Sequence, residues 1–419
     1  MEVKYETARP EDLDDVMDFG NYVFSHAHKP TDYPAILPKL YKREFFMDAI
    51  HYLAREDGKI KAAVGGYPLE MEFSLDDQSG ASLTLPGRGI GMVSVHPYSR
   101  SKGYMKELMK RALDDMRRDG IVFSCLSGRR QRYEYFGYTP VGCVYVFTCS
   151  EENIRHTLGP QWSAKIGAAP QDGQLSLRSV GPDDSALLDK IQAIHEAKPA
   201  RIRRKRDRLY ETLSSWSARV LAVMEGDRFI GYLVYKANRK EHSISEINLN
   251  DLSRLPEALG IFLRNGRAVG MEGSVEVSAA PHELGKIAAL SRFAEDYTGN
   301  WAYHFQVFDY KRFVEPFMVL KARDQALADG SCVLRIEDSP PLLLSVTGGI
   351  PSVTEQLSTT QLPTAQLPTA TAEVSLSRLD ALHFLFSPLA AGVFPAIGKS
   401  VFLRSLLPLP LFFENADGV

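Results

Sequence analysis

The segment Gly91–Lys106 combines residue types that can hold a phosphate group. It reads GMVSVHPYSRSKGYMK, an apolar strand over Met92–Val95 followed by a loop with Arg100, Lys102 and Gly103, after which a helix begins. This order directs backbone N–H groups, a helix dipole and two cations at one point, which favours an anion. Gly103 also lets the backbone approach an anion closely. The same spacing is compatible with an ordinary strand–turn–helix whose basic residues lie on the surface.

Two other segments carry residues that could bind a ligand. His26 and His28 are separated by one residue, which is compatible with a metal pair, with the lining of a substrate pocket or with plain exposure. The metal pair is the weakest of these interpretations, because the sequence offers no third ligand. The run RIRRKRDR at 201–208 suggests an anion or nucleic-acid patch. Apolar residues at helical spacing around it favour instead a helix with a solvated basic face.

The composition excludes several functional classes. The 419 residues predict two or three domains, and 44% hydrophobic with 24% charged residues is typical of a soluble globular protein. The net charge of −3, from 49 basic and 52 acidic side chains, argues against a dedicated nucleic-acid binder. The four cysteines form no CxxC pair and no cluster with histidine, so we expect neither a metal site nor a disulfide framework.

We expect no membrane or export segment. The N-terminus is acidic and amphipathic, unlike a signal peptide. No apolar run reaches the length of about 18 residues that a spanning helix needs. Together with the unpaired cysteines, this predicts a cytoplasmic protein.

Strands and helices alternate in the first 150 residues and must position the Gly91–Lys106 segment. Strands are predicted at 3–8, 51–55, 59–69, 89–95, 121–126 and 138–148, with one helix after residue 9 and another over 103–118. Such alternation favours a mixed or parallel sheet covered by helices, in the α/β or α+β class.

The pattern then repeats weakly. Residues 175–188 echo 5–16, and residues 220–235 echo 51–67, each time as a strand leading into a charged turn or an acidic helix start. We therefore predict a second copy over about 171–320, with a linker at 157–174. The last hundred residues predict a small α+β domain, interrupted by a low-complexity stretch at 354–371.

The string from Val93 to Met105 closely resembles motif A of the GNAT acetyltransferases, V-x-V-x-P-x-x-[RQ]-x-x-G-x-[GAL]. The resemblance implies acetyl-CoA as co-substrate and no metal. The strand residues would face its pantetheine arm, and the loop would hold its diphosphate. Met105 departs from the more usual Gly or Ala. The cofactor-binding residues implied are Val93, Ser94, Val95, Arg100, Ser101, Lys102, Gly103, Tyr104, Met105 and Lys106.

A second motif follows downstream. RYEYFGY at 132–138 resembles the family's FYxxxGF signature, in which the first tyrosine is the general acid toward the leaving thiolate. That position is Tyr133, and a proton donor within about 3 Å would ease thiolate departure. The alternative is a packed core tyrosine. Gly128 and Arg129 would touch the adenosine phosphates of the cofactor or cap a turn.

Two such copies followed by a small sterol-carrier-like domain resemble the Eis (enhanced intracellular survival) type of acetyltransferase. The domains implied are 1–156 (catalytic), 157–320 (degenerate, because an R-x-x-G loop is missing after its strand at 243–248) and 321–419. In this type the C-terminal carboxylate, here that of Val419, is the general base. Asp417 and Glu414 are the nearest substitutes, and a frayed terminus is the alternative. A homo-oligomer, a trimer or hexamer, is also implied.

The resemblance predicts an acetyl-CoA-dependent N-acetyltransferase. A primary amine of an aminoglycoside-like, polyamine or lysine-type acceptor would attack the thioester directly in a ternary complex, with its carbonyl polarised through the Val95 N–H. Two alternatives remain open at this point. One is a non-catalytic acyl-CoA or lipid-binding sensor with a retained fold, and the other is transfer of a longer acyl chain.

Overall fold

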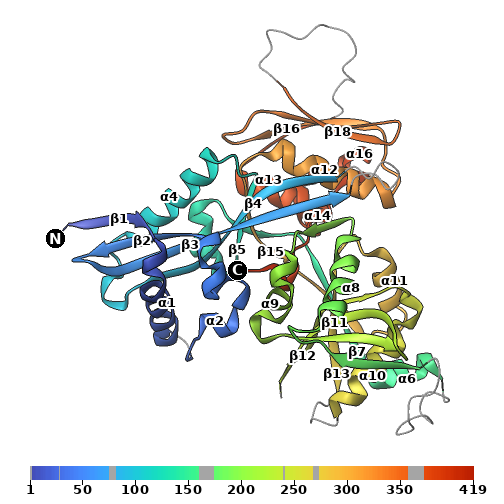
Figure 1. Cartoon of the computed structure of the whole chain (residues 1–419). Coiled ribbons are helices and arrows are strands. Elements are labelled where there is room, and N and C mark those ends of the chain that lie inside the picture. Colours follow the sequence, from blue (N-terminus) through green and yellow to red (C-terminus); the bar gives the residue numbers. More distant parts are fainter. Residues whose placement is uncertain are drawn as a thin grey trace.

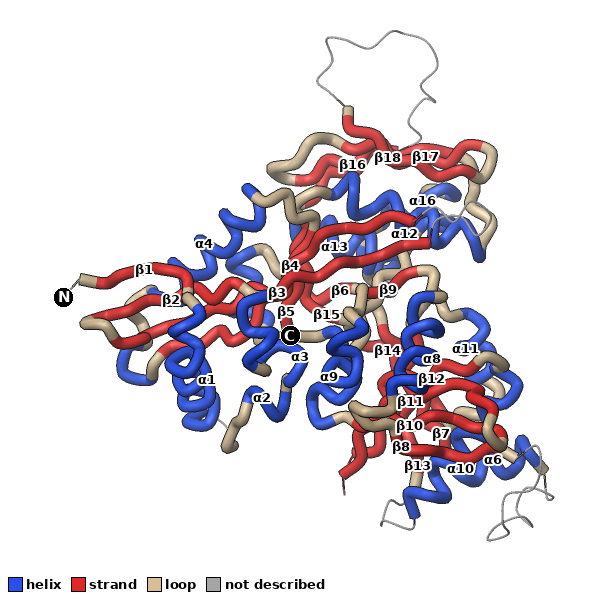
Figure 2. The backbone as a smooth tube through the Cα atoms, viewed as in Figure 1, coloured by secondary structure: helices blue, strands red, loops and turns tan. Residues whose placement is uncertain are grey.

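Three β-sheets with their helices lie side by side in the computed structural model (Figures 1 and 2). The structure describes residues 2–27, 29–74, 82–159, 174–238, 241–267, 273–356 and 372–419. His28 and most of the predicted linker and of the low-complexity stretch lie outside these residues. The mixed sheets and flanking helices confirm the predicted fold class.

The first sheet contains the predicted phosphate-binding segment. Its strands, in spatial order, are β1 (Val3–Thr7), β2 (Ile50–Glu56), β3 (Lys59–Ser74), β4 (Ser82–Val95), β5 (Phe123–Leu126), β15 (Tyr303–Val307) and β6 (Thr139–Val141), with β9 (Ala200–Ile202) on the distal part of β3. β4 is antiparallel to β3 and parallel to β5.

Helices cover both faces of this sheet because its strands alternate their side chains between two cores. α1 (Leu13–Ala27) and α3 (Pro38–Tyr41) pack on one face with Leu53, Ala63 and Met92. α4 (Tyr104–Arg118) packs on the other with Ala54 and Ile90. α4 forms where predicted because its apolar residues recur on one buried stripe.

The second sheet repeats this order. Its strands are β14 (Asp296–Asn300), β7 (Val144–Ser150), β13 (Ser274–Ala279), β12 (Glu241–Leu249), β11 (Arg228–Asn238), β10 (Arg219–Glu225) and β8 (Leu175–Ser179). β12 is antiparallel to β11 and parallel to β13, as β4 is to β3 and β5. α8 (Ser185–Glu196) and α9 (Leu209–Ser214) cover one face, and α10 (Leu255–Arg267) covers the other.

The two sheets exchange one strand each. The strand predicted at 138–148 is in fact two strands, and the second of them, β7, pairs with β13 and β14 of the second sheet. In return β15, near the end of the second copy, pairs with β5 and β6 of the first sheet. The predicted domain boundary at residue 156 stays a prediction, but the hydrogen-bonded sheets cross it in both directions.

The third sheet is small and packs on the first. It consists of β18 (Ile350–Glu355), β17 (Leu342–Thr347), β16 (Gly330–Ile336) and β19 (Ala372–Leu376). Between the sheets lies α12 (Tyr310–Asp324), whose Phe313 and Phe317 join Phe73 and Phe123 of the first sheet in one core. Helices α13 (Arg378–Phe386), α14 (Ala390–Val393), α15 (Pro395–Lys399) and α16 (Val401–Leu406) complete this part.

The chain ends in the middle of the molecule, beside the first sheet (Figure 1). After α16 it is an extended tail whose apolar residues Leu407, Leu409, Leu411 and Phe413 are buried. The tail ends in the short helix η8 (Asn415–Asp417) and Val419, which is only 8% exposed.

The basic run at 201–208 differs from the prediction. It forms the end of β9, an extended stretch and the short helix η5 (Arg206–Arg208) rather than a helix with a solvated face. Arg204 is 4% exposed. Its burial follows from carboxylates that lie far away in the sequence, described below.

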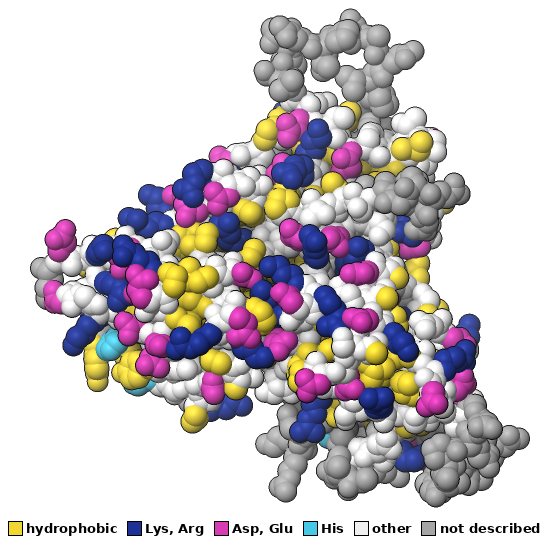
Figure 3. Space-filling model, in the orientation of Figure 1, with side chains coloured by type: hydrophobic (Ala, Val, Ile, Leu, Met, Phe, Trp, Pro, Cys, Tyr) yellow, Lys and Arg dark blue, Asp and Glu magenta, His cyan; other side chains and the backbone are white. Residues whose placement is uncertain are grey.

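The visible surface carries charges of both signs interspersed with apolar side chains (Figure 3). Among the described residues, none of the helices combines the length and the apolar character needed to cross a bilayer. The same residues contain no group of three or more His, Cys, Asp or Glu side chains that could hold a metal ion.

Candidate active site

β4 and β5 separate where the motif begins. Their pairing is described from Gly87 to Gly89 and ends there. Next to this point Met92 has a positive φ of 49°, and the register with β3 shifts by one residue, which marks a bulge in β4. Among the described residues, no strand therefore pairs with the β5-facing edge of β4 after Gly89.

The backbone of Val95 points to this open edge. The N–H of His96 donates to the carbonyl of Lys61 on β3. Val95 is opposite Ala62, so the alternation of an antiparallel ladder turns its N–H and C=O away from β3. This edge therefore presents backbone groups that can pair with an extended ligand.

The loop after β4 forms a concave set of backbone N–H groups. Ser101 and Gly103 both have left-handed φ, of 68° and 82°, and α4 begins at the next residue. A Cβ on Gly103 would meet no atom within 4 Å, so the space above it is open. Left-handed residues in a loop that leads into a helix N-terminus make a ready anion site. The side chains of Arg100 and Lys106 are exposed at this loop.

Two of the predicted cations have partners within the protein. The Lys102 ammonium lies 3.0 Å from Glu56, and this pairing raises the pKa of Lys102 and lowers that of Glu56. The Lys106 ammonium lies 4.5 Å from the centre of the Tyr135 ring. The backbone of the loop is therefore better placed to hold an anion than the Lys102 side chain.

The remaining cofactor residues divide between the two faces of the sheet. Val93, Val95 and Met105 are half-buried and pack with Tyr104 on the side of α4. Ser94 is buried, and its hydroxyl has no hydrogen-bond partner among the described residues. The sequence motif did not distinguish these two orientations.

Tyr133 lies at the end of the short helix α5 (Arg130–Tyr133) and is 6% exposed. A Cβ on Gly128 would lie 2.5 Å from its ring, so Gly128 gives the ring its room. Burial raises the pKa of the Tyr133 phenol, although Arg132 lowers it, so the group keeps its proton. Burial raises the pKa of Tyr33, and the nearby Tyr41 and Tyr133 raise it further.

The C-terminal residue lies on a stripe of glycines in β4. A Cβ on Gly89 would come within 2.8 Å of the Val419 side chain, and one on Gly91 would lie 3.6 Å from the Val419 carbonyl carbon. The absence of a side chain at Gly89 makes room for the Val419 side chain, and Gly91 lies in van der Waals range of the terminus. The resemblance to the Eis type points to Val419 but gives no sign of the two glycines.

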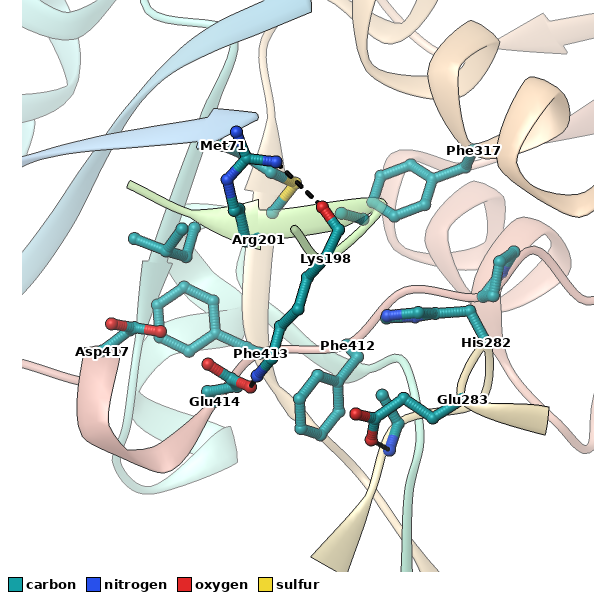
Figure 4. Close-up of a pocket in the computed structure, with 14 residues that line it drawn as sticks. Met71, Lys198, Arg201, His282, Glu283, Phe317, Phe412, Phe413, Glu414 and Asp417 are labelled. Carbon is teal, nitrogen blue, oxygen red and sulfur yellow. Dashed lines mark hydrogen bonds and ion pairs between the residues drawn. The ribbon is translucent and has the colours of Figure 1, made fainter. Parts of the chain in front are cut away.

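Ionic contacts with Arg204 and Lys198 hold the tail in place. Arg204 donates to Asp417 at 2.8 and 3.0 Å, to Glu414 at 2.6 Å and to Glu246 on β12 at 2.7 Å. Lys198 also pairs with Glu414 (Figure 4). Burial raises the pKa of Asp417 in spite of Arg204. For Glu414, burial would raise the pKa, but Lys198 and Arg204 together lower it.

Two further contacts hold the last residues against the first sheet. The buried Lys39 ammonium donates to the carbonyl of Ala416 at 2.5 Å. The Tyr303 hydroxyl of the exchanged strand β15 donates to an oxygen of Val419 at 3.3 Å. Burial raises the pKa of Tyr303, while its hydrogen bonds to Ser127 and Val419 lower it. Because Ser127 precedes Gly128, which contacts Tyr133, the two predicted catalytic residues lie at opposite ends of one short chain of contacts.

A cavity of about 330 Å³ opens beside the terminus. It lies between the α3–η2 segment of the first unit, with η2 at Arg43–Asp48, and the segment that contains the basic run. Tyr67, Asp417 and Val419 form its inner wall. The C-terminal residue therefore borders an open space.

Comparisons with known proteins identify one domain and the overall fold. The family model of the acetyltransferase (GNAT) domain matches residues 4–141. No curated protein matches the chain in sequence. The fold is similar to a probable N-acyltransferase from Enterococcus faecalis V583, a conserved protein of unknown function, at 16% identity, a TM-score of 0.64 and 98% coverage of both chains.

Two other solved structures also match over nearly their whole length. A GCN5-related N-acetyltransferase from Kribbella flavida has 16% identity and a TM-score of 0.61, with 97% of this chain and 95% of that chain covered. Eis1 from Mycobacterium abscessus has 14% identity and a TM-score of 0.54, with 100% and 99% covered. The chain therefore carries a GNAT-type acyltransferase domain over residues 4–141, within a full-length fold that it shares with Eis1.

Proposed function

We propose that the protein transfers an acetyl group from acetyl-CoA to a primary amine by direct attack in a ternary complex. The loop Arg100–Gly103 fits the diphosphate, because Ser101 and Gly103 are left-handed and the space above Gly103 is open. The open edge of β4 at Val93–Val95 fits an amide-containing pantetheine arm. Bound there, acetyl-CoA would supply the acetyl group as an activated thioester.

Three groups of this chain then divide the chemistry. The Val419 carboxylate takes the proton of the attacking amine as the new C–N bond forms. The Val95 N–H stabilises the negative charge on the thioester oxygen. Tyr133 gives its proton to the sulfur as the C–S bond breaks, so one proton is removed and one is delivered in each turnover. Burial supports the last role because it keeps the phenol protonated.

The observation that carries this proposal is the burial of the C-terminal residue on the glycines of β4. A chain terminus is normally frayed and solvated. Here Val419 is 8% exposed, lies over Gly89 and Gly91, and receives a hydrogen bond from Tyr303. This burial and this hydrogen bond support a role for a terminal carboxylate held at a fixed position.

The acceptor needs a primary amine that can reach Val419 through the 330 Å³ cavity. Aminoglycoside-like, polyamine and lysine-type acceptors, which the sequence resemblance implies, all present one. We also propose that the protein is cytoplasmic, that it forms a homo-oligomer, and that its domains are residues 1–156, 157–320 and 321–419.

Removing Val419 tests the mechanism. The deletion moves the terminal carboxylate to Gly418, and we expect kcat for amine acetylation to fall about a hundredfold, because a small displacement of a catalytic group is that costly. The KM for acetyl-CoA should be unchanged. The measurement is the amount of free CoA thiol that has been released when the reaction is stopped.

Val419→Ala is the matched control, because it shortens the side chain and keeps the carboxylate. Its kcat should stay within about tenfold of the wild type, which is well above the deletion. A deletion variant that retains full kcat would exclude the terminal carboxylate as the base. A wild-type protein that binds acetyl-CoA and acetylates no amine would refute the enzymatic proposal.

A further inference from the structure

The cavity beside Val419 has an unusual charge for a site that would accept a polycation. Five cationic side chains line it, against three carboxylates and the chain terminus. The cations are Lys39, Arg203, Arg204, Lys205 and Arg208, and the side-chain carboxylates are Asp48, Glu70 and Asp417. The excess of cations is not spread evenly around the wall.

Near the terminus the charges are matched. Three cations, Arg204, Lys198 and Lys39, lie beside three carboxylates, Asp417, Glu414 and Glu246. Arg203 pairs with Glu70 at 2.8 Å. This part of the wall offers no net charge to a ligand beyond the carboxylate of Val419.

At the other part of the wall two cations share one carboxylate. Lys205 lies 3.3 Å from Asp48, and Arg208 pairs with the same carboxyl group. The Arg208 guanidinium also stacks on Phe45, 3.9 Å from the ring centre, which fixes its position. Asp207 lies 3.8 Å from Arg208, but its side chain is 67% exposed and outside the cavity lining. The cavity therefore carries a net positive charge at this part of the wall.

We infer that the acceptor amine carries an anionic group, a carboxylate or phosphate, which Lys205 and Arg208 bind while the amine reaches Val419. This inference rests on the proposed function and narrows its acceptor class. A diamine or aminoglycoside would place its second ammonium against the two cations, and Coulomb repulsion would oppose binding. Phe45, Leu40 and Leu69 in the same wall suit an apolar body between the two polar ends.

Three amines of one shape test the inference. They are para-aminomethylbenzoate, benzylamine and para-xylylenediamine, which differ only in an anionic, absent or cationic group at the far end. We expect kcat/KM to decrease in that order, with about tenfold or more between the first and the last. The phosphonate analogue of the first compound distinguishes a carboxylate site from a phosphate site.

The variants Lys205→Gln and Arg208→Gln should lose this preference mainly through KM for the acidic amine. Lys205 is 60% exposed, so its variant tests the inference even if Arg208→Gln does not fold. Arg206→Gln is the control, because Arg206 lies on the same short helix but pairs with Asp189 and does not line the cavity.

Calorimetric binding of the same amines separates this inference from the proposed chemistry. If no amine is acetylated but the acidic one binds best, the mechanism fails and the inference holds. If the diamine binds or reacts best, or if Lys205→Gln leaves the preference unchanged, the inference is overturned and the acetyltransferase proposal is unaffected.

Discussion

β4 of the first sheet and β12 of the second occupy equivalent positions in the two copies but have different surroundings. Each is antiparallel to a hairpin partner on one side and parallel to a second strand over only two or three residues. Beyond this pairing both strands separate from their parallel neighbours. The separation alone is therefore a property of the repeated fold and does not create a site.

The difference lies in what fills the space next to each strand. β4 presents the glycines 89 and 91 and receives the chain terminus. β12 presents the buried Glu246 and Asn248, which contact Arg204 and Lys286. In the first copy this space receives the C-terminal residue, and in the second it is filled by polar side chains, of which Glu246 holds Arg204 and through it the tail.

The loops that follow the two strands differ in the same sense. After β4, two left-handed residues open the backbone N–H groups to an external anion. After β12, the Asp251 side chain accepts the N–H of Ser253, and Arg254 pairs with Glu225 and Glu257. The second loop satisfies its polar groups internally.

Removing the hydroxyl of Tyr133 should have the largest effect on the active copy. General acids contribute about 10² to 10⁴ in rate, so we expect Tyr133→Phe to lower kcat by that range with little change in KM for acetyl-CoA. Tyr135→Phe is the control, because Tyr135 is two residues away and 70% exposed. Equal kcat values for the two variants would mean that Tyr133 only packs.

The largest effect of the second copy should be on stability. Arg204→Gln leaves Glu246, Glu414 and Asp417 buried with less positive charge, and loss of one partner of a buried ionic cluster costs about 3–5 kcal/mol. Urea unfolding measures this change. Arg206→Gln, which breaks an exposed pair with Asp189, should cost less than about 1 kcal/mol. If Arg204→Gln is as stable as the wild type, the second copy does not anchor the tail.

A smaller effect is expected from backbone strain in the loop after β4. Gly103→Ala forces an alanine into φ +82°, which costs about 1–2 kcal/mol, and we expect KM for acetyl-CoA to rise about tenfold. Gly120→Ala is matched to it, because Gly120 also has a left-handed φ, of 66°, and open space around its Cα. Both variants should lose similar stability, but only the first should change KM. An equal KM in both would remove the loop from cofactor binding.

Local sequence could predict the active copy because its parts are contiguous. The strand, the loop and α4 occupy residues 91–118, and each depends on neighbours within a few positions. The same holds for Tyr133 and Gly128. The strand after Gly137 was predicted as one element because β6 and β7 are both apolar and only three residues apart.

The rest depends on contacts between residues that are distant in the sequence. Arg204 looks like part of a solvated basic face because its partners Glu246, Glu414 and Asp417 lie 42 to 213 positions away. Tyr303 has no local signal at all, since it reaches the site through the exchange of β15. Charge and polarity alone cannot tell which ions a fold will bury.

The smallest effect on kcat should come from Lys39, and it tests whether the hydrogen bond from Lys39 to Ala416 helps to place Val419. Burial lowers the pKa of Lys39 from 10.5 to about 8. Between these values the unfolded chain binds a proton that the folded chain has released, so the stability should rise with pH, by an amount on the order of 3 kcal/mol. Lys39→Met should flatten this slope and, by releasing Ala416, lower kcat about two- to fivefold. Lys321→Met is the control. Burial also lowers the pKa of Lys321 to about 8, so this variant should likewise flatten the dependence of stability on pH. It should leave kcat unchanged, because Lys321 donates to the carbonyl of Pro408 and not to Ala416. If both variants lower kcat equally, the hydrogen bond to Ala416 has no special part in placing Val419.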